Sequence, residues 1–80
     1  MSLRIITHPA KISQWITDRN GTPVRRRGTD AEVRVAFEAA GADYETLTVD
    51  ELLEAMKFHN LVMLVDQEAG KNFHKIYAHS

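Results

Sequence analysis

The stretch Leu47-Thr48-Val49-Asp50-Glu51-Leu52-Leu53 decides how the second half of this sequence folds. Thr48 and Glu51 have the spacing of a capping box, in which each side chain accepts a hydrogen bond from the backbone N–H of the other residue. The leucines that flank the box stand at the positions of a hydrophobic staple, and the two acidic residues favour the first turn of a helix. We therefore predict a helix that begins here and runs to about His59, with Asn60 in a left-handed conformation after it.

The residues after this helix predict a β-hairpin. Leu61-Val62-Met63-Leu64-Val65 is apolar throughout, which favours a strand covered on both faces and therefore central in a sheet. A polar loop that contains Gly70 follows, and Phe73 to Ala78 returns as the hairpin partner.

The residues before the capping box predict a first helix and two or three strands. Ile12, Trp15, Ile16 and Arg19 recur at helical spacing, with Thr7 or His8 as the cap, Pro9 in the first turn and Asn20-Gly21 at the end. Val24 to Arg27, bracketed by Pro23 and Gly28, fits either a short edge strand or an extended loop. Glu32 to Phe37 alternates as a strand with Val33, Val35 and Phe37 on one face, and Tyr44 to Leu47 fits a further strand.

Together these segments predict an α+β fold in which two helices pack on one face of a small antiparallel sheet of four to five strands. The chain has 80 residues and shows no internal repeat or linker, so residues 1–80 form a single domain.

The composition excludes several classes of function. The chain has no cysteine, so it has no disulfide, no thiolate zinc site and no nucleophilic thiol. Its formal net charge of −1 gives no overall attraction to nucleic acid or to an anionic membrane. No apolar stretch approaches the ~20 residues of a spanning helix, and the first residues lack the apolar segment of a signal peptide. We expect a cytoplasmic protein.

One cluster of cationic residues is a candidate binding surface. Guanidinium groups form forked hydrogen bonds to phosphates, and a run of three arginines lies close in sequence to two further cations. The candidate contacts to an anion or a nucleic acid are Lys11, Arg19, Arg25, Arg26 and Arg27. The alternative is that these residues are solvated or paired with Asp18, Asp30 or Glu32, because in an extended segment the central arginine of the run points away from its two neighbours.

No set of residues predicts catalysis, a metal site or a cofactor. Of the four histidines, His74 and His79 are an odd number of residues apart, so a regular strand sends them to opposite faces. His8 and His59 lie at predicted helix ends, where capping explains them. The carboxylates fall at caps, in turns and on helix surfaces, and no serine has the context of a nucleophile elbow. Trp15 on the apolar face of a helix is expected in the core.

The sequence resembles a family of short bacterial proteins of unknown function. The motifs that carry the resemblance are Trp15, Arg19, Gly21, Pro23, Gly28-Thr29, Val33 to Phe37, Asp50 to Met56, Asn60-Leu61 and Phe73-His74-Lys75. Some members of that family carry the label 1,4-alpha-glucan branching enzyme, a reaction that needs a large catalytic barrel, which 80 residues cannot build. The family tends to have aromatic residues where this chain has Leu52, Leu53 and Met56, so a site built on those aromatics is altered here.

These observations favour a non-enzymatic binding or interaction module. Its partner is an unknown protein or a second copy, bound at the sheet edge or at the segment from Pro23 to Thr29. The alternative is a nucleic-acid-binding protein that uses the arginine run.

Overall fold

The computed structural model describes residues 1–79 as two helices and six strands. Their order along the chain is β1 Leu3–Ile6, α1 Pro9–Asp18, β2 Thr22–Arg26, β3 Val33–Ala36, β4 Tyr44–Thr46, α2 Val49–Phe58, β5 Leu61–Asp66 and β6 His74–Ala78. The predicted α+β class is confirmed.

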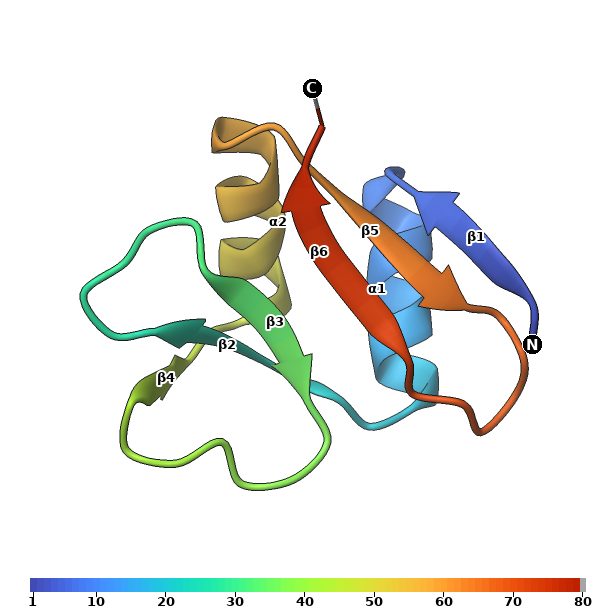
Figure 1. Cartoon of the computed structure of the whole chain (residues 1–80), viewed down its shortest axis with the longest axis horizontal. Helices are drawn as coiled ribbons and strands as arrows, with labels where there is room; N and C mark the ends of the chain where they lie inside the picture. The colour runs from blue at the N-terminus through green and yellow to red at the C-terminus, as the bar shows by residue number, and fades with distance from the viewer. Residues whose placement is uncertain (80) are drawn as a thin grey trace.

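The strands form two antiparallel sheets of three strands, with the orders β1-β5-β6 and β3-β2-β4. The prediction of one sheet of four to five strands is therefore wrong. The two sheets lie side by side, with β3 of the smaller sheet next to β6 of the larger one (Figure 1). The predicted hairpin of β5 and β6 is confirmed, and β5 is the central strand of its sheet, as its apolar run indicates.

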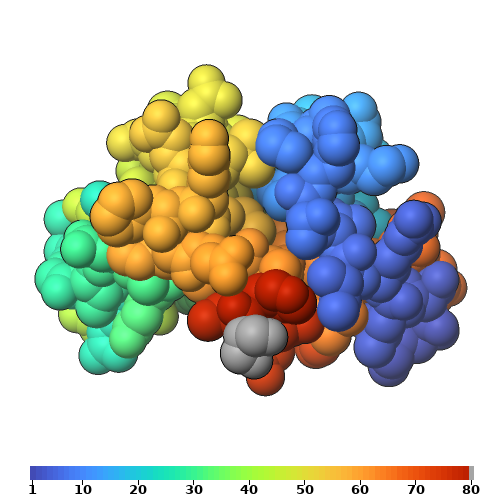
Figure 2. All heavy atoms as spheres, turned by 90° about the horizontal axis from the view of Figure 1, so that it is seen from above, coloured from blue at the N-terminus to red at the C-terminus, as the bar shows by residue number. Residues whose placement is uncertain are grey.

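Both helices lie on the same side of the two sheets. In Figure 1 they lie behind the strands, and Figure 2 shows them along one side of the molecule with β6 on the other. The core fills the space between these layers. It contains fully buried side chains from both helices and from the strands, among them Ile12, Ile16, Val35, Leu52, Met63 and Val65.

The capping box of α2 forms as the sequence predicts. The Thr48 hydroxyl accepts a hydrogen bond of 3.1 Å from the N–H of Glu51, and the Glu51 carboxylate accepts one of 2.8 Å from the N–H of Thr48. Leu47 and Leu52, the two residues of the predicted staple, are both buried in the core. Asn60 follows the helix with φ of 55°, which confirms the predicted left-handed residue.

Helix α1 also has the predicted ends. The Nδ1 atom of His8 accepts a hydrogen bond of 3.2 Å from the N–H of Ala10, so His8 rather than Thr7 is the cap. Asn20 has φ of 54°, and the N–H of Gly21 bonds to the carbonyl of Ile16 at 3.0 Å. These contacts end the helix and turn the chain into β2.

Two strand assignments differ from the sequence prediction. Strand β1 was not predicted, because the adjacent Ile5 and Ile6 interrupt the alternation in a segment of four residues. Strand β2 is the centre of the smaller sheet and not an edge. Pro23 is tolerated there because its backbone faces the side of β4, where Leu47 donates to the Pro23 carbonyl at 2.9 Å just beyond the last residue of β4.

Candidate interaction surface

The side of the two sheets that faces away from the helices is here called the open face. Because side chains alternate along a strand, the neighbours of the core residues point to this side. The residues of the open face are Leu3, Ile5, Thr22, Val24, Arg26, Arg34, Ala36, Tyr44, Thr46, Val62, Leu64, Asp66, Lys75 and Tyr77. Four of them, Val24, Ala36, Val62 and Asp66, are nevertheless buried.

One half of the open face is apolar. Leu3 and Ile5 of β1 are 46% and 53% exposed, and Ile5 lies opposite the half-buried Leu64 of β5. When a partner covers large aliphatic side chains that are this exposed, the free energy of the complex falls because apolar surface is removed from water. This half was not predicted from the sequence, because the local pattern does not indicate β1.

The other half combines cations with aromatic rings. The guanidinium of Arg34 lies 4.6 Å from the centre of the Tyr44 ring, and the ammonium of Lys75 lies 5.9 Å from the centre of the Tyr77 ring. Both distances are within the range of cation–π attraction. The alternation of β3 already predicts that Arg34 points away from the core, but its pairing with Tyr44 of β4 depends on the sheet order.

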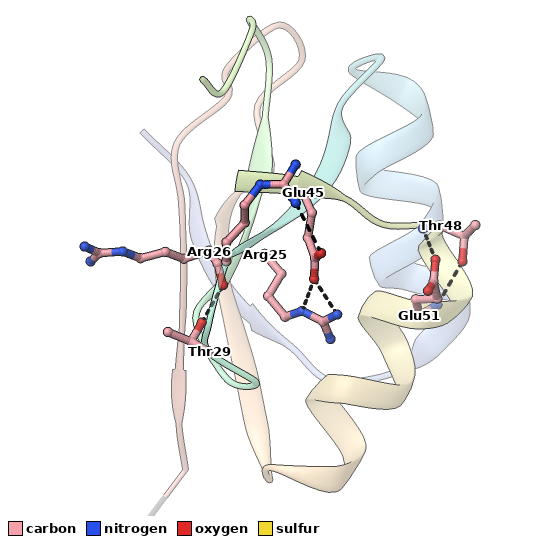
Figure 3. A network of polar contacts seen from close by, with 7 residues as sticks. Arg25, Arg26, Thr29, Glu45, Thr48 and Glu51 are labelled. Atoms are coloured by element: carbon pink, nitrogen blue, oxygen red, sulfur yellow. Dashed lines mark hydrogen bonds and ion pairs between the residues drawn. The ribbon is translucent and has the colours of Figure 1, made fainter. Parts of the chain in front are cut away.

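The arginine run of β2 is paired with carboxylates. Arg25 donates to the Glu45 carboxylate through Nε and Nη2, at 2.8 and 2.5 Å. Arg26 pairs with Glu32 at 3.6 Å, and Arg27 pairs with Glu45 at 3.9 Å and donates to the Ala42 carbonyl. In Figure 3, Arg25 turns toward Glu45 while Arg26 extends in another direction. Adjacent arginines of the run therefore lie on opposite faces, as the alternation predicts.

Arg19 holds the loop between β5 and β6 against α1. Its Nε donates to the Lys71 carbonyl at 2.6 Å, and Nη2 donates to the carbonyls of Asp66 and Glu68 at 3.2 and 3.1 Å. Its guanidinium also stacks over the ring of Trp15, 4.4 Å from the centre. The indole N–H of Trp15 donates to the same Asp66 carbonyl at 2.9 Å. Arg19 therefore has structural contacts that use most of its donors.

Lys11, the fifth predicted cation, is exposed on α1. It lines a shallow hollow between α1 and the β1-β5 edge, together with Ile6, Gln14 and Asp18. This hollow lies against the larger sheet, whereas the arginine run belongs to the smaller one.

His74 connects the two sheets. Its Nε2 accepts a hydrogen bond of 3.0 Å from the N–H of Val35 in β3, so Nδ1 carries the proton and donates to the Asn72 carbonyl at 3.1 Å. The imidazole packs against the rings of Trp15 and Phe37, with centroids 5.6 and 5.8 Å away. This burial lowers the pKa of His74 below its ordinary value, and the charge of Arg34 acts in the same direction.

Two carboxyl groups have lowered pKa values for structural reasons. Hydrogen bonds from the backbone and side chain of Thr48 lower the pKa of Glu51. The backbone N–H of Glu68 lowers the pKa of Asp66, and the N–H of Ser2 adds to this effect. Both carboxylates thus accept hydrogen bonds from the backbone at the ends of elements.

Within residues 1–79, no group of three His, Cys, Asp or Glu side chains has the arrangement of a metal site. Over the same residues, neither helix has the length and apolar character needed to cross a membrane.

No protein-family profile, no curated protein and no solved structure matches this chain. The resemblance to the bacterial family therefore stays a prediction from the sequence motifs.

Proposed function

We propose that this chain is a non-enzymatic interaction module that binds a protein partner through the apolar half of the open face. The observation that carries the proposal is the exposure of Leu3 and Ile5, at 46% and 53%, next to Leu64 on an edge of the larger sheet. Burial of such side chains contributes about 25 cal/mol for each Å² of apolar surface removed from water. We expect the module to act in the cytoplasm.

The contacts of the titratable groups support a role without catalysis. Both nitrogens of the His74 imidazole are hydrogen-bonded to the backbone. The carboxylates of Glu51 and Asp66, whose pKa values are lowered, accept backbone hydrogen bonds at a helix cap and a strand end. A general acid or base needs a nitrogen or oxygen atom that can reach a substrate. These groups instead form hydrogen bonds that stabilise the fold.

The proposal is tested by selecting binders from a library of random peptides displayed on phage. We expect the selected peptides to be rich in aliphatic residues, to lose binding to the Leu64→Lys and Ile5→Lys variants, and to retain binding to Phe58→Lys. Phe58 is 85% exposed on α2, away from the open face, so it is a matched control. Peptides that bind all three variants equally would contradict the proposal.

A second candidate function is nucleic-acid binding, and it is favoured by the position of Arg34 and Lys75. Both cations project from the open face beside tyrosine rings, an arrangement in which phosphates and bases are contacted together. This pair of cations differs from the predicted nucleic-acid contacts, which are Lys11, Arg19 and the arginine run. Four of those five residues contact other groups of the protein.

Fluorescence anisotropy with single-stranded DNA and RNA at about 50 mM salt tests this second candidate. If phosphates are bound here, binding weakens with salt, and Arg34→Ala and Lys75→Ala each reduce the salt slope by about 1. Lys57→Ala, on the opposite side of the molecule, serves as the control. No change in anisotropy would rule this candidate out.

A further inference from the structure

We infer that the partner of the apolar half is a second copy of this chain, joined along the free edge of β1 in an isologous, two-fold symmetric dimer. This inference rests on the proposed function, because it names the partner that covers the same surface. Three observations carry it: the unpaired backbone of β1, the apolar side chains beside that backbone, and the charges of α1 that flank it.

The backbone of β1 has a free edge that is suited to strand pairing. The N–H of Gln67 donates to the Ser2 carbonyl at 2.8 Å, so residues 2, 4 and 6 turn their backbone groups toward β5. Leu3 and Ile5 turn their backbone groups away from β5, to a side where no strand of residues 1–79 lies next to β1. An edge of this kind is a template for pairing with another strand. Strand β1 has no proline, and its one charged residue, Arg4, lies on the helix side but is exposed.

The side chains along this edge are self-complementary in one register. Met1, Leu3 and Ile5 are three of the five large hydrophobic residues that are exposed within residues 1–79. Leu3 and Ile5 lie on one face of β1, and Met1 precedes the strand at the same spacing. An antiparallel pair centred on Leu3 places Leu3 opposite its own copy and Ile5 opposite Met1 of the second copy. Centring the pair on Arg4 instead would bring two like charges face to face, which is unfavourable.

Helix α1 is complementary to itself about the same axis. Lys11 and Asp18 line the hollow beside β1, one near each end of the helix. The indole of Trp15 reaches the carbonyl of Asp66, and Asp66 lies opposite Leu3. Arg19 bonds to the same carbonyl, and the hollow extends from Ile6 to Gln67, which bonds to Ser2, so the part of α1 between Lys11 and Asp18 lies alongside β1. A two-fold axis at Leu3 places the two copies of α1 antiparallel, with Lys11 of each copy facing Asp18 of the other.

The other strand edges are less suited to pairing with a second copy. Strand β4 has only three residues, and the free edges of β3 and β6 face each other across the contact made by His74. The β1 edge is short as well, and stable interfaces usually bury about 1,200 Å² or more in total. We therefore expect a dimer that dissociates on dilution.

Sedimentation equilibrium over a concentration series up to about 1 mM tests this inference. We expect the mass to rise from the 9.1 kDa of the chain to twice that value. Ile5→Lys and Leu3→Lys should each weaken the dimer by roughly 30-fold or more, since each adds a buried charge on both sides of the axis. Phe58→Lys should leave it unchanged. A mass of 9.1 kDa at every concentration, or dimers unaffected by Ile5→Lys, would overturn the inference.

A charge exchange on α1 tests the symmetry of the interface. Lys11→Asp and Asp18→Lys each place like charges opposite each other at two sites, and we expect each to weaken the dimer by about fivefold to tenfold. The double variant restores opposite charges and should restore the dimer. Both positions are exposed, so circular dichroism should show the fold unchanged. Single variants that fold and dimerise like the parent protein would contradict this geometry.

Amide hydrogen exchange gives a residue-level check. Within residues 1–79, the N–H of Ile5 points to the edge of the sheet, where no strand pairs with it, whereas the N–H of Arg4 points to β5. We expect exchange at Ile5 to slow as the concentration rises, because the dimer bonds its N–H, and exchange at Arg4 to be slow throughout. If the chain stays monomeric while peptides from the library still bind at Ile5, the dimer is wrong and the interaction module stands. If neither occurs, both proposals fail.

Discussion

The Nε2 atom of His74 accepts a hydrogen bond from the backbone N–H of Val35, and this contact of 3.0 Å joins the two sheets. A side chain of one sheet thereby satisfies a donor on the free edge of the other. The bond requires a neutral imidazole, because a protonated ring has no acceptor. One of the contacts between the two sheets therefore depends on the charge state of a single residue.

This dependence predicts that the protein loses stability in mild acid. The pKa of His74 is lowered in the folded state, so the unfolded chain takes up the proton first as the pH falls below about 6.5. Stability is complete above that pH and declines as the pH approaches the folded pKa. Urea unfolding between pH 7.5 and pH 5 measures the effect, with His74→Phe as the control. An equal decline in the control would contradict this role.

A second prediction concerns Arg19, whose contacts depend on its shape as well as its charge. Arg19→Lys keeps the charge but cannot reach the carbonyls of Asp66, Glu68 and Lys71 together. We expect a loss of about 1 to 3 kcal/mol in the free energy of unfolding. The reverse change Lys11→Arg, on the exposed side of the same helix, should alter stability little. If Arg19→Lys is as stable as the parent protein, the contacts to the loop are not important.

A third prediction tests the capping box of α2. Thr48→Ala removes the hydroxyl that accepts from the Glu51 N–H and should cost about 1 kcal/mol, whereas Thr48→Ser keeps an oxygen there and should cost less. Because hydrogen bonds from Thr48 lower the pKa of Glu51, the contribution of that carboxylate is present at neutral pH and is lost as the pH falls through its folded pKa. Thermal unfolding at pH 7 and pH 3 measures both effects.

A fourth prediction compares two ion pairs of the smaller sheet. Arg25 and Glu45 are about two-thirds buried, at 31% and 35% side-chain exposure, and share two hydrogen bonds. We expect a double-mutant cycle with Arg25→Met and Glu45→Gln to give a coupling of about 1 kcal/mol. The matched pair Arg26 and Glu32, at 3.6 Å and 58% exposure each, should give about 0 to 0.5 kcal/mol. Equal coupling energies would show that the greater burial of the Arg25–Glu45 pair does not strengthen it.

The parts of the fold that the sequence predicts correctly depend on neighbouring residues. The capping box, the left-handed residues Asn20 and Asn60, and the hairpin of β5 and β6 are all determined within about twenty residues of chain. The division into two sheets was not predictable in this way. The edges of β3 and β6 meet through the His74 imidazole, which lies 39 residues from Val35, and a contact over that separation is not shown by the local pattern.

The candidate surface was only partly predictable for the same reason. The spacing of Trp15 and Arg19 places them on one side of a helix, but three of the four carbonyl partners of Arg19 lie 47 to 52 residues away. Spacing and charge could therefore not predict these bonds within the protein, and a contact of Arg19 with an anion stays a prediction. The apolar half of the open face depends on β1, whose position is set by its pairing with β5.

The pairing of β1 with β5 also constrains when the chain can fold during synthesis. Leu3 lies opposite Asp66, so β1 has to wait for β5, which is made much later in the chain, before the two strands can pair. The strands of the smaller sheet are close in sequence, so this sheet can form as soon as β2, β3 and β4 have been made. We expect the larger sheet to form later than the smaller one, which leaves the apolar residues of β1 unpaired until β5 has been made.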